Sequence, residues 1–240
     1  MTVEQDAIRL VRPASPTDQA ELPKGMSRYV QAEELPLRNA VEAWGRQRWP
    51  DARVVHELVM DRGQVRLDVG FVCPAWLAVV EVKSGYDSTE RLMHQVGLGR
   101  LCANEVWVAA DMRHRRDVEL MQHLLPSVGH LDCQVEIHAR RREQEPLQLT
   151  ERQVPRGTLA PVPEMMLALC WVAELRAISE RKRVPHGKRA THAAMIRELA
   201  QVLSAEEVTA EVCRELRARD CLWRADPPIP IPATAAELVQ

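Results

Sequence analysis

Two carboxylates and one ammonium group stand at a spacing that suits metal-assisted chemistry: Asp68 in RLDVGFV, and Glu81 and Lys83 in VVEVKS. Both segments have the pattern of β-strands, and a turn between Pro74 and Ala75 would join them. In such an antiparallel hairpin Asp68 lies nearly opposite Glu81, with the Cβ atoms about 5 Å apart. Lys83 follows Glu81 by two residues and therefore projects from the same face. We expect the three groups to converge at one end of a sheet.

A phosphodiester-cleaving site has a use for each member of this set, whereas burying it for stability alone would be costly. Asp68 and Glu81 suit a hard ion, Mg²⁺ or Mn²⁺, which lowers the pKa of a water molecule and neutralises charge on the scissile phosphate. Lys83 can orient the attacking water or stabilise the transition state. The alternative is an ordinary cross-strand ion pair, since such triplets are common. The strand context and the hairpin symmetry favour the metal site.

The elements that would position these residues form a mixed α/β pattern. Alternation places Leu67, Val69 and Phe71 on one face of the hairpin's first strand and Asp68 on the other. Asp87 and Glu90 have the spacing of a capping box for the next helix. Helices are predicted over residues 31–48, 88–103 and 116–125, and strands over 54–60, 64–72, 76–84, 105–110 and 134–139. This order predicts a mixed sheet flanked by helices.

The C-terminal third is expected to be helical. Helices are predicted over residues 164–178, 192–203 and from Ser204 to about 219. We therefore expect a flexible arm over 1–25, an α/β core over 26–150, a helical subdomain over 160–222 and a Pro-rich tail over 223–240.

The bulk composition limits the class of partner. A net charge of -2 argues against a generally basic DNA-coating protein, so any nucleic-acid contact must come from local patches. The sequence contains no apolar run of about 18 residues, so no membrane span is expected. The N-terminus lacks the apolar segment of a secretory signal. The six scattered cysteines fit reduced thiols. We expect a cytoplasmic protein with no membrane partner.

The two strands together resemble the PD-(D/E)XK, or restriction-endonuclease-like, nuclease superfamily. The resemblance continues into the next helix through Lys83-Ser84, Asp87, Arg91-Leu92 and Gln95. This pattern is most similar to the sce-named family of uncharacterised bacterial and phage nuclease-like proteins, and more distantly to MmcB-like and VRR-NUC nucleases. The match covers roughly residues 55–110. It implies a restriction-endonuclease-like mixed sheet, Asp68 and Glu81 as metal ligands, Lys83 as the catalytic lysine, and Gln95 as a helix-borne residue facing the site.

Further acids could complete the metal site. The superfamily often adds a glutamate from the first helix, and Glu34 and Glu42 are the candidates, of which we prefer Glu34. Glu57 on the first strand is another, with an exposed strand acid as the alternative. His94 adjoins Gln95, but successive helix residues point about 100° apart, so at most one of the two faces the site squarely.

Nucleic-acid contacts are expected from a basic stretch between two C-terminal helices. Its members are Arg181, Lys182, Arg183, Lys188 and Arg189. Each could contact a phosphate group. The basic clusters at 113–116 and 140–142 are interpreted as solvated loops instead.

Together these patterns predict a Mg²⁺- or Mn²⁺-dependent endonuclease or exonuclease acting on nucleic acid, with DNA preferred, in repair, phage or defence biology. One alternative is a catalytically silent restriction-endonuclease-like module that binds nucleic acid or a host protein. Another is a structural partner in a replication or repair assembly. A homodimer is also open, because cutting both strands with this fold commonly implies one.

Overall fold

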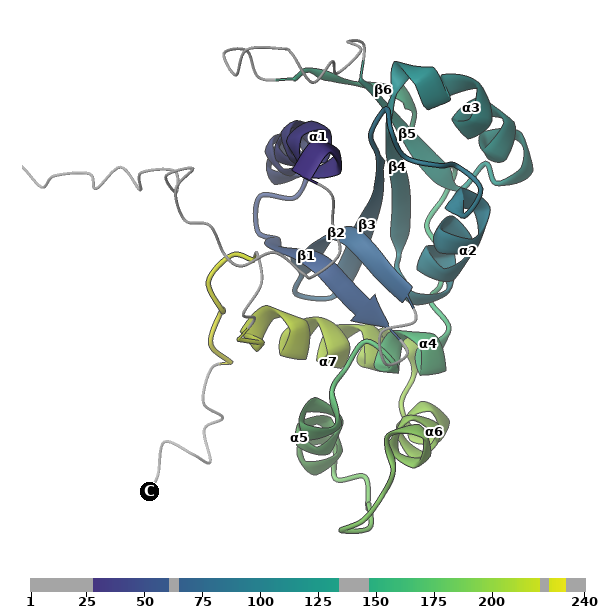
Figure 1. Ribbon diagram of the computed structural model, residues 1–240. Coiled ribbons are helices and arrows are strands. Elements are labelled where there is room, and N and C mark those ends of the chain that lie inside the picture. The colour runs from purple at the N-terminus through teal and green to yellow at the C-terminus, as the bar shows by residue number, and fades with distance from the viewer. Residues whose placement is uncertain (1–27, 61–64, 134–146, 221–224, 232–240) are drawn as a thin grey trace, which may run out of the picture.

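The computed structural model describes residues 28–60, 65–133, 147–220 and 225–231. Within them a six-stranded sheet carries helices on both faces (Figure 1). The strands are β1 (Arg53–Met60), β2 (Val65–Cys73), β3 (Trp76–Lys83), β4 (Glu105–Asp111), β5 (Val128–Cys133) and β6 (Leu149–Gln153). The helices are α1 (Arg28–Arg48), α2 (Leu92–Cys102), α3 (Arg115–Leu124), α4 (Pro163–Leu167), α5 (Val172–Lys182), α6 (His192–Val202) and α7 (Ala205–Ala218), with a short 3-10 helix η2 (Met112–His114). The predicted mixed α/β sheet with C-terminal helices is confirmed.

The sheet has the spatial order β1-β2-β3-β4-β5-β6. The first three strands pair antiparallel, β3, β4 and β5 are parallel, and β6 returns antiparallel. Between β2 and β3, Cys73 pairs with Trp76 and Val69 pairs with Val80. This is the register expected for a turn between Pro74 and Ala75, and the predicted hairpin alignment is therefore confirmed. One further step along the register places Asp68 beside Glu81.

Each face of the sheet has its own apolar core. On one face, Leu37 and Val41 of α1 pack with Phe71, Val80 and the fully buried Trp107. On the other face the sheet packs against α2, α3 and the C-terminal helices. Figure 1 shows α1 on the opposite side of the sheet from α2 and α7. The open end of the β2–β3 hairpin, opposite the turn at Pro74 and Ala75, is thus enclosed by α1 on one side and α2 on the other.

The β1–β2 hairpin exchanges its faces at Glu57 and Asp68. Leu67 was predicted to share a face with Val69, but this is wrong, because Leu67 packs with Leu58 in the core opposite to that of Val69. Glu57 has a left-handed backbone with φ 55°, a conformation that costs a non-glycine residue of order 1–3 kcal/mol. The strand register is the same on both sides of this point. The left-handed backbone at Glu57 therefore breaks the strict alternation of side chains between the two faces at Glu57 and Asp68. The pairing of β1 with β2 does not shift.

Helix α2 begins later than predicted. The proposed capping box would start it near residue 88, but the helix begins at Leu92. Asp87 does not cap it, because its Oδ2 accepts hydrogen bonds from Ser84 N at 2.7 Å and Ser84 Oγ at 2.8 Å. The carboxylate therefore closes a turn directly after Lys83, next to the candidate site.

The helix predicted over residues 164–178 is two helices, α4 and α5, separated by residues 168–171. At the break, the Arg219 side chain donates to Leu169 O at 2.7 Å, and Glu174 Oε2 accepts from Trp171 N at 2.6 Å. Side chains thus supply hydrogen bonds that a continuous helix would have formed along its backbone. The two halves can then pack on different neighbours.

The far edge of the sheet also differs from expectation. The strand predicted over 134–139 lies outside the described residues, as does the arm over 1–25, and β5 and β6 were not predicted. From the expected Pro-rich tail, Ala225 forms a β-bridge with Val55, and Asp226 N donates to Val54 O at 2.9 Å. That segment covers part of the edge strand β1, whose unpaired backbone groups would otherwise be exposed. Among the helices described, none is long and apolar enough to cross a membrane.

Candidate metal centre

Asp68 stands at the fork where β2 separates from β3. Its Oδ2 accepts a hydrogen bond from Val82 N at 2.8 Å, so the side chain continues the hydrogen bonding where the strand pairing ends. Its Oδ1 accepts from Arg38 Nη2 at 2.9 Å, and its backbone oxygen accepts from Arg38 Nη1 at 2.8 Å. The carboxylate is therefore fixed from both β3 and α1.

Glu81, Lys83 and Gln95 meet on the face covered by α2. Lys83 Nζ donates to Glu81 Oε1 at 2.8 Å and to Gln95 Oε1 at 3.0 Å. Glu81 and Lys83 are both buried. His94, the neighbour of Gln95, is exposed, as expected if only one of the two faces the site. The structure brings together the four residues predicted to be catalytic, with Asp68 supplied from β2.

The carboxyl group of Glu81 is poorly accommodated without a cation. Burial, and then the charge of Asp68, raise the pKa of Glu81 to about 8, although Lys83 acts in the opposite direction. Its Oε2 receives no hydrogen bond from an N–H or O–H donor among the described residues, and a side-chain hydrogen bond with Asp68 adds to the rise in pKa. An unpartnered buried oxygen beside a second carboxylate is the donor set that a hard divalent ion would use. The residues present therefore fit the Mg²⁺ or Mn²⁺ that the resemblance implies.

This pKa shift predicts how the ion-free protein responds to pH. Between the ordinary value of 4.5 and about 8, the folded state holds a proton on Glu81 that the unfolded state has lost. Stability from this group is complete below 4.5 and is lost as pH rises to about 8, by at most about 1.4 kcal/mol per pH unit. Glu81→Gln cannot lose this proton. We therefore expect its free energy of unfolding, taken relative to that of wild type, to increase by at least about 1 kcal/mol as the pH rises from 5 to 8.

Urea unfolding of both proteins in EDTA at several pH values measures this difference. Two curves of stability against pH that remain parallel across that range would contradict the assignment of a raised pKa to Glu81.

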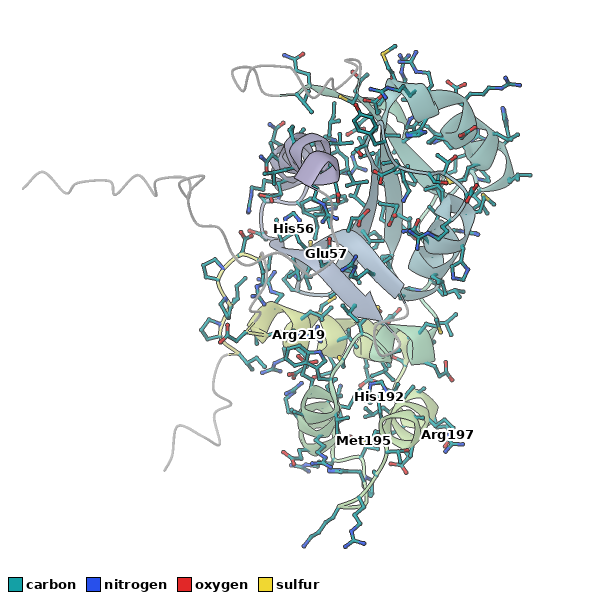
Figure 2. The ribbon with its side chains drawn as sticks, in the orientation of Figure 1. His56, Glu57, His192, Met195, Arg197 and Arg219 are labelled. Carbon is teal, nitrogen blue, oxygen red and sulfur yellow. The ribbon has the colours of Figure 1, made fainter. Side chains whose placement is uncertain are left out.

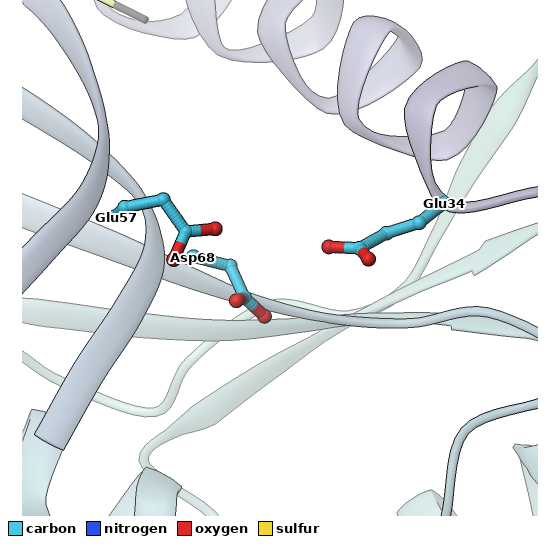
Figure 3. Close-up of side chains that lie close together, drawn as sticks. All are labelled: Glu34, Glu57 and Asp68. Atoms are coloured by element: carbon cyan, nitrogen blue, oxygen red, sulfur yellow. The ribbon is translucent and has the colours of Figure 1, made fainter. Parts of the chain in front are cut away.

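Glu34 and Glu57 lie on the α1 side of Asp68. Oxygen atoms of the three carboxylates are within 4.8 Å of one another, and Figure 3 shows the side chains pointing into one space from α1, β1 and β2. Burial raises the pKa of Glu34, and Arg38 opposes this shift. Of the two glutamates considered on the first helix, Glu34 lies in this group, whereas Glu42 contacts His56 Nε2 at 2.6 Å.

Two further buried residues, Arg38 and His56, lie at this site and were not predicted from the sequence. Burial by itself would lower the pKa of Arg38, but Asp68, Glu34 and Glu57 raise it above its ordinary value. His56 lies beside Glu57 on β1 (Figure 2), and its Nδ1 is 3.5 Å from Arg38 Nη1. The one signal in the sequence was the i, i+4 spacing of Glu34 and Arg38 on a predicted helix.

Two of the five predicted nucleic-acid contacts are ion-paired. Arg181 contacts Glu211 at 2.7 Å and also contacts Glu215, and Lys182 contacts Glu207 at 2.8 Å. These carboxylates belong to α7, so both side chains fasten α5 to α7. The other three, Arg183, Lys188 and Arg189, are exposed. They lie on the α5–α6 connection, which Figure 1 shows on the side facing away from the sheet.

Comparison with known proteins gives one family match. The model of a family described as Bacteriophage P4 protein cII matches residues 32–230 of the chain. No curated protein gives a significant match. Among solved structures, a protein of unknown function from Silicibacter pomeroyi aligns with a TM-score of 0.39 and 18% sequence identity, covering 66% of this chain and 97% of that chain.

Proposed function

The chain belongs to the family of bacteriophage P4 protein cII, and we propose that it is a metal-dependent nuclease that hydrolyses phosphodiester bonds, with DNA as the expected substrate. The observation that carries the proposal is the buried Glu81, whose Oε2 has no partner among the described residues. Asp68 and Lys83 lie beside it, in the arrangement predicted from the hairpin. Membership in a family named after a phage protein agrees with the expected link to phage biology, and the family description names no activity.

Asp68 and Glu81 are the residues that would hold Mg²⁺ or Mn²⁺. When bound, the ion would polarise the scissile phosphate and activate water. Lys83 Nζ carries three N–H donors, and two of them go to Glu81 and Gln95. The third can donate to a phosphate oxygen or orient the attacking water. Because Gln95 and Glu81 fix the ammonium group, its position is set before substrate binds.

Substrate binding is assigned to exposed basic residues. We infer that Arg183, Lys188 and Arg189 contact the phosphate backbone at a distance from the cleaved bond, since they are exposed on one connection. Arg181 and Lys182 are given a supporting role, because their charges are balanced by glutamates of α7. Phosphate contacts of this kind position a nucleic acid without reading its sequence.

The test is a panel of linear, nicked and branched DNA and of RNA, each incubated with Mg²⁺, Mn²⁺ or EDTA. We expect wild type to cut DNA with either ion and to be inactive in EDTA. The Lys83→Ala variant, run beside it, guards against a contaminating nuclease. Binding to the panel without cut products under any condition would instead indicate the catalytically silent module.

A further inference from the structure

Arg38 occupies the centre of the acidic group on the α1 side. Its Nε donates to Glu34 Oε1 at 2.6 Å, and its Nη2 lies 2.6 Å from Glu57 Oε1 and 2.9 Å from Asp68 Oδ1. Three carboxylates from three different elements thus share one guanidinium group. The Arg38 side chain is 9% exposed, so the contacts form in a largely water-free environment where charge interactions are strong.

The three carboxylates have the composition of a divalent-cation site, but the guanidinium of Arg38 already contacts all three of them, and Arg66 pairs with Glu57 as well. An ion placed among Glu34, Glu57 and Asp68 would have to displace a guanidinium that also donates to the backbone oxygen of Asp68. The situation at Glu81 is the opposite, because its Oε2 has no partner among the described residues. The two sides of Asp68 therefore differ: on one side Arg38 contacts every carboxylate, and on the other Lys83 pairs with Glu81 Oε1 alone.

The fold maintains this arrangement at a cost. Glu57 reaches Arg38 because its backbone is left-handed, with φ 55°, which places its side chain on the α1 side of the hairpin. A strained residue of this kind persists where its surroundings over-determine it. Glu34 reaches the same guanidinium from one helical turn before Arg38. The acids are thus arranged around Arg38.

We propose that Arg38 is a positioning residue that takes the place of a second divalent cation. The centre at Asp68 and Glu81 then binds a single ion, and Glu34 and Glu57 hold Arg38 instead of metal. The single-ion part of this inference rests on the proposed function, whereas the role of Arg38 as an internal cation does not. Arg38, a residue of α1, also holds one carboxylate oxygen of Asp68 in place before any ion binds.

The test counts Mn²⁺ ions bound to the full-length protein by calorimetric titration, with electron paramagnetic resonance of free Mn²⁺ as a second readout. We expect one ion for wild type and two for Arg38→Gln, which removes the guanidinium that the three carboxylates share and leaves only the pairing of Glu57 with Arg66. Arg38→Lys, which keeps the positive charge, should stay at one. In Glu57→Gln and Glu34→Gln the Mn²⁺ affinity of the single site should fall by less than the decrease of about tenfold or more expected when a ligand, or a group hydrogen-bonded to a ligand, is lost, since both residues reach Asp68 only through Arg38.

The outcomes separate this inference from the proposed function. Two ions in wild type, one ion in both wild type and a folded Arg38→Gln, or a loss of at least about tenfold in Mn²⁺ affinity in Glu57→Gln would overturn it. No ion in wild type together with one in Arg38→Gln would uphold Arg38 as the internal cation while refuting the metal centre at Asp68 and Glu81. If Arg38→Gln does not fold, the two glutamate variants decide the matter, because they leave Arg38 in place.

Discussion

Asp68→Asn and Lys83→Ala should each reduce Mg²⁺-dependent cleavage by at least about 100-fold, but for different reasons. Asp68→Asn removes a charge from the two-carboxylate donor set, so Mn²⁺ affinity should fall by at least about tenfold as well. Lys83→Ala removes a donor to substrate and leaves both carboxylates in place, so Mn²⁺ should still bind. The proposed roles therefore predict that both variants lose cleavage and that only Asp68→Asn loses Mn²⁺ affinity.

Single-turnover cleavage rates and Mn²⁺ titrations of the same preparations measure both effects. Asp117→Asn is the matched control, because Asp117 is an exposed carboxylate on α3 and its loss should change neither quantity. Near-wild-type cleavage by both site variants would rule out this mechanism, whatever the fold. Loss of Mn²⁺ binding in Lys83→Ala would show that the lysine shapes the metal site, and that its role in catalysis has been misassigned.

The proximity of the candidate site residues could be predicted because the information for it is local. The alternating pattern on both sides of Pro74 and Ala75 determines the hairpin register, and the register determines which residue lies near Glu81. Lys83 follows from the two-residue period of a strand. Gln95 came from the resemblance, and the structure places it against Lys83. Each step spans fewer than about 30 residues and depends on no distant contact.

The α1 side of the site could not be predicted in the same way. Glu57 is neither glycine nor asparagine, the residues that commonly mark a left-handed backbone, so nothing in the strand pattern indicates that the faces exchange there. The exchange is stabilised by Arg38, which lies 19 positions earlier in α1. Such a contact is a tertiary effect that overrides local alternation.

Strand β5 was missed for a related reason. The segment contains Gly129 and the buried acid Asp132, which are unfavourable in a strand read by itself. Gly129 is required because a Cβ there would lie 2.3 Å from the Trp107 ring. Asp132 is tolerated because Arg115 and Arg152 both pair with it. Its fit in the sheet depends on side chains from β4, α3 and β6, which the segment alone does not reveal.

The break between α4 and α5 leads to the second large effect, on stability. Arg219 donates to both oxygens of Glu174, at 2.7 and 2.6 Å, and its guanidinium lies 4.4 Å from the centre of the Trp171 ring. Figure 2 shows it where α7 meets α5. Arg219→Ala would leave the buried Glu174 charge and Leu169 O without this donor. We expect a loss of about 3–5 kcal/mol in the free energy of unfolding, the usual cost of breaking a buried pair.

Urea unfolding compares this variant with Arg197→Ala, which removes an exposed arginine from α6 (Figure 2) and should change stability by less than about 0.5 kcal/mol. The double variant Glu174→Gln with Arg219→Met should recover part of the loss, because it removes both charges together. Equal, small losses in Arg219→Ala and Arg197→Ala would mean that the pair does not hold the break. If the large loss is found, Arg219 stabilises the fold in which residues 164–178 form two helices, because it supplies the hydrogen bonds to Leu169 O and Glu174 that take the place of a continuous helix through residues 168–171.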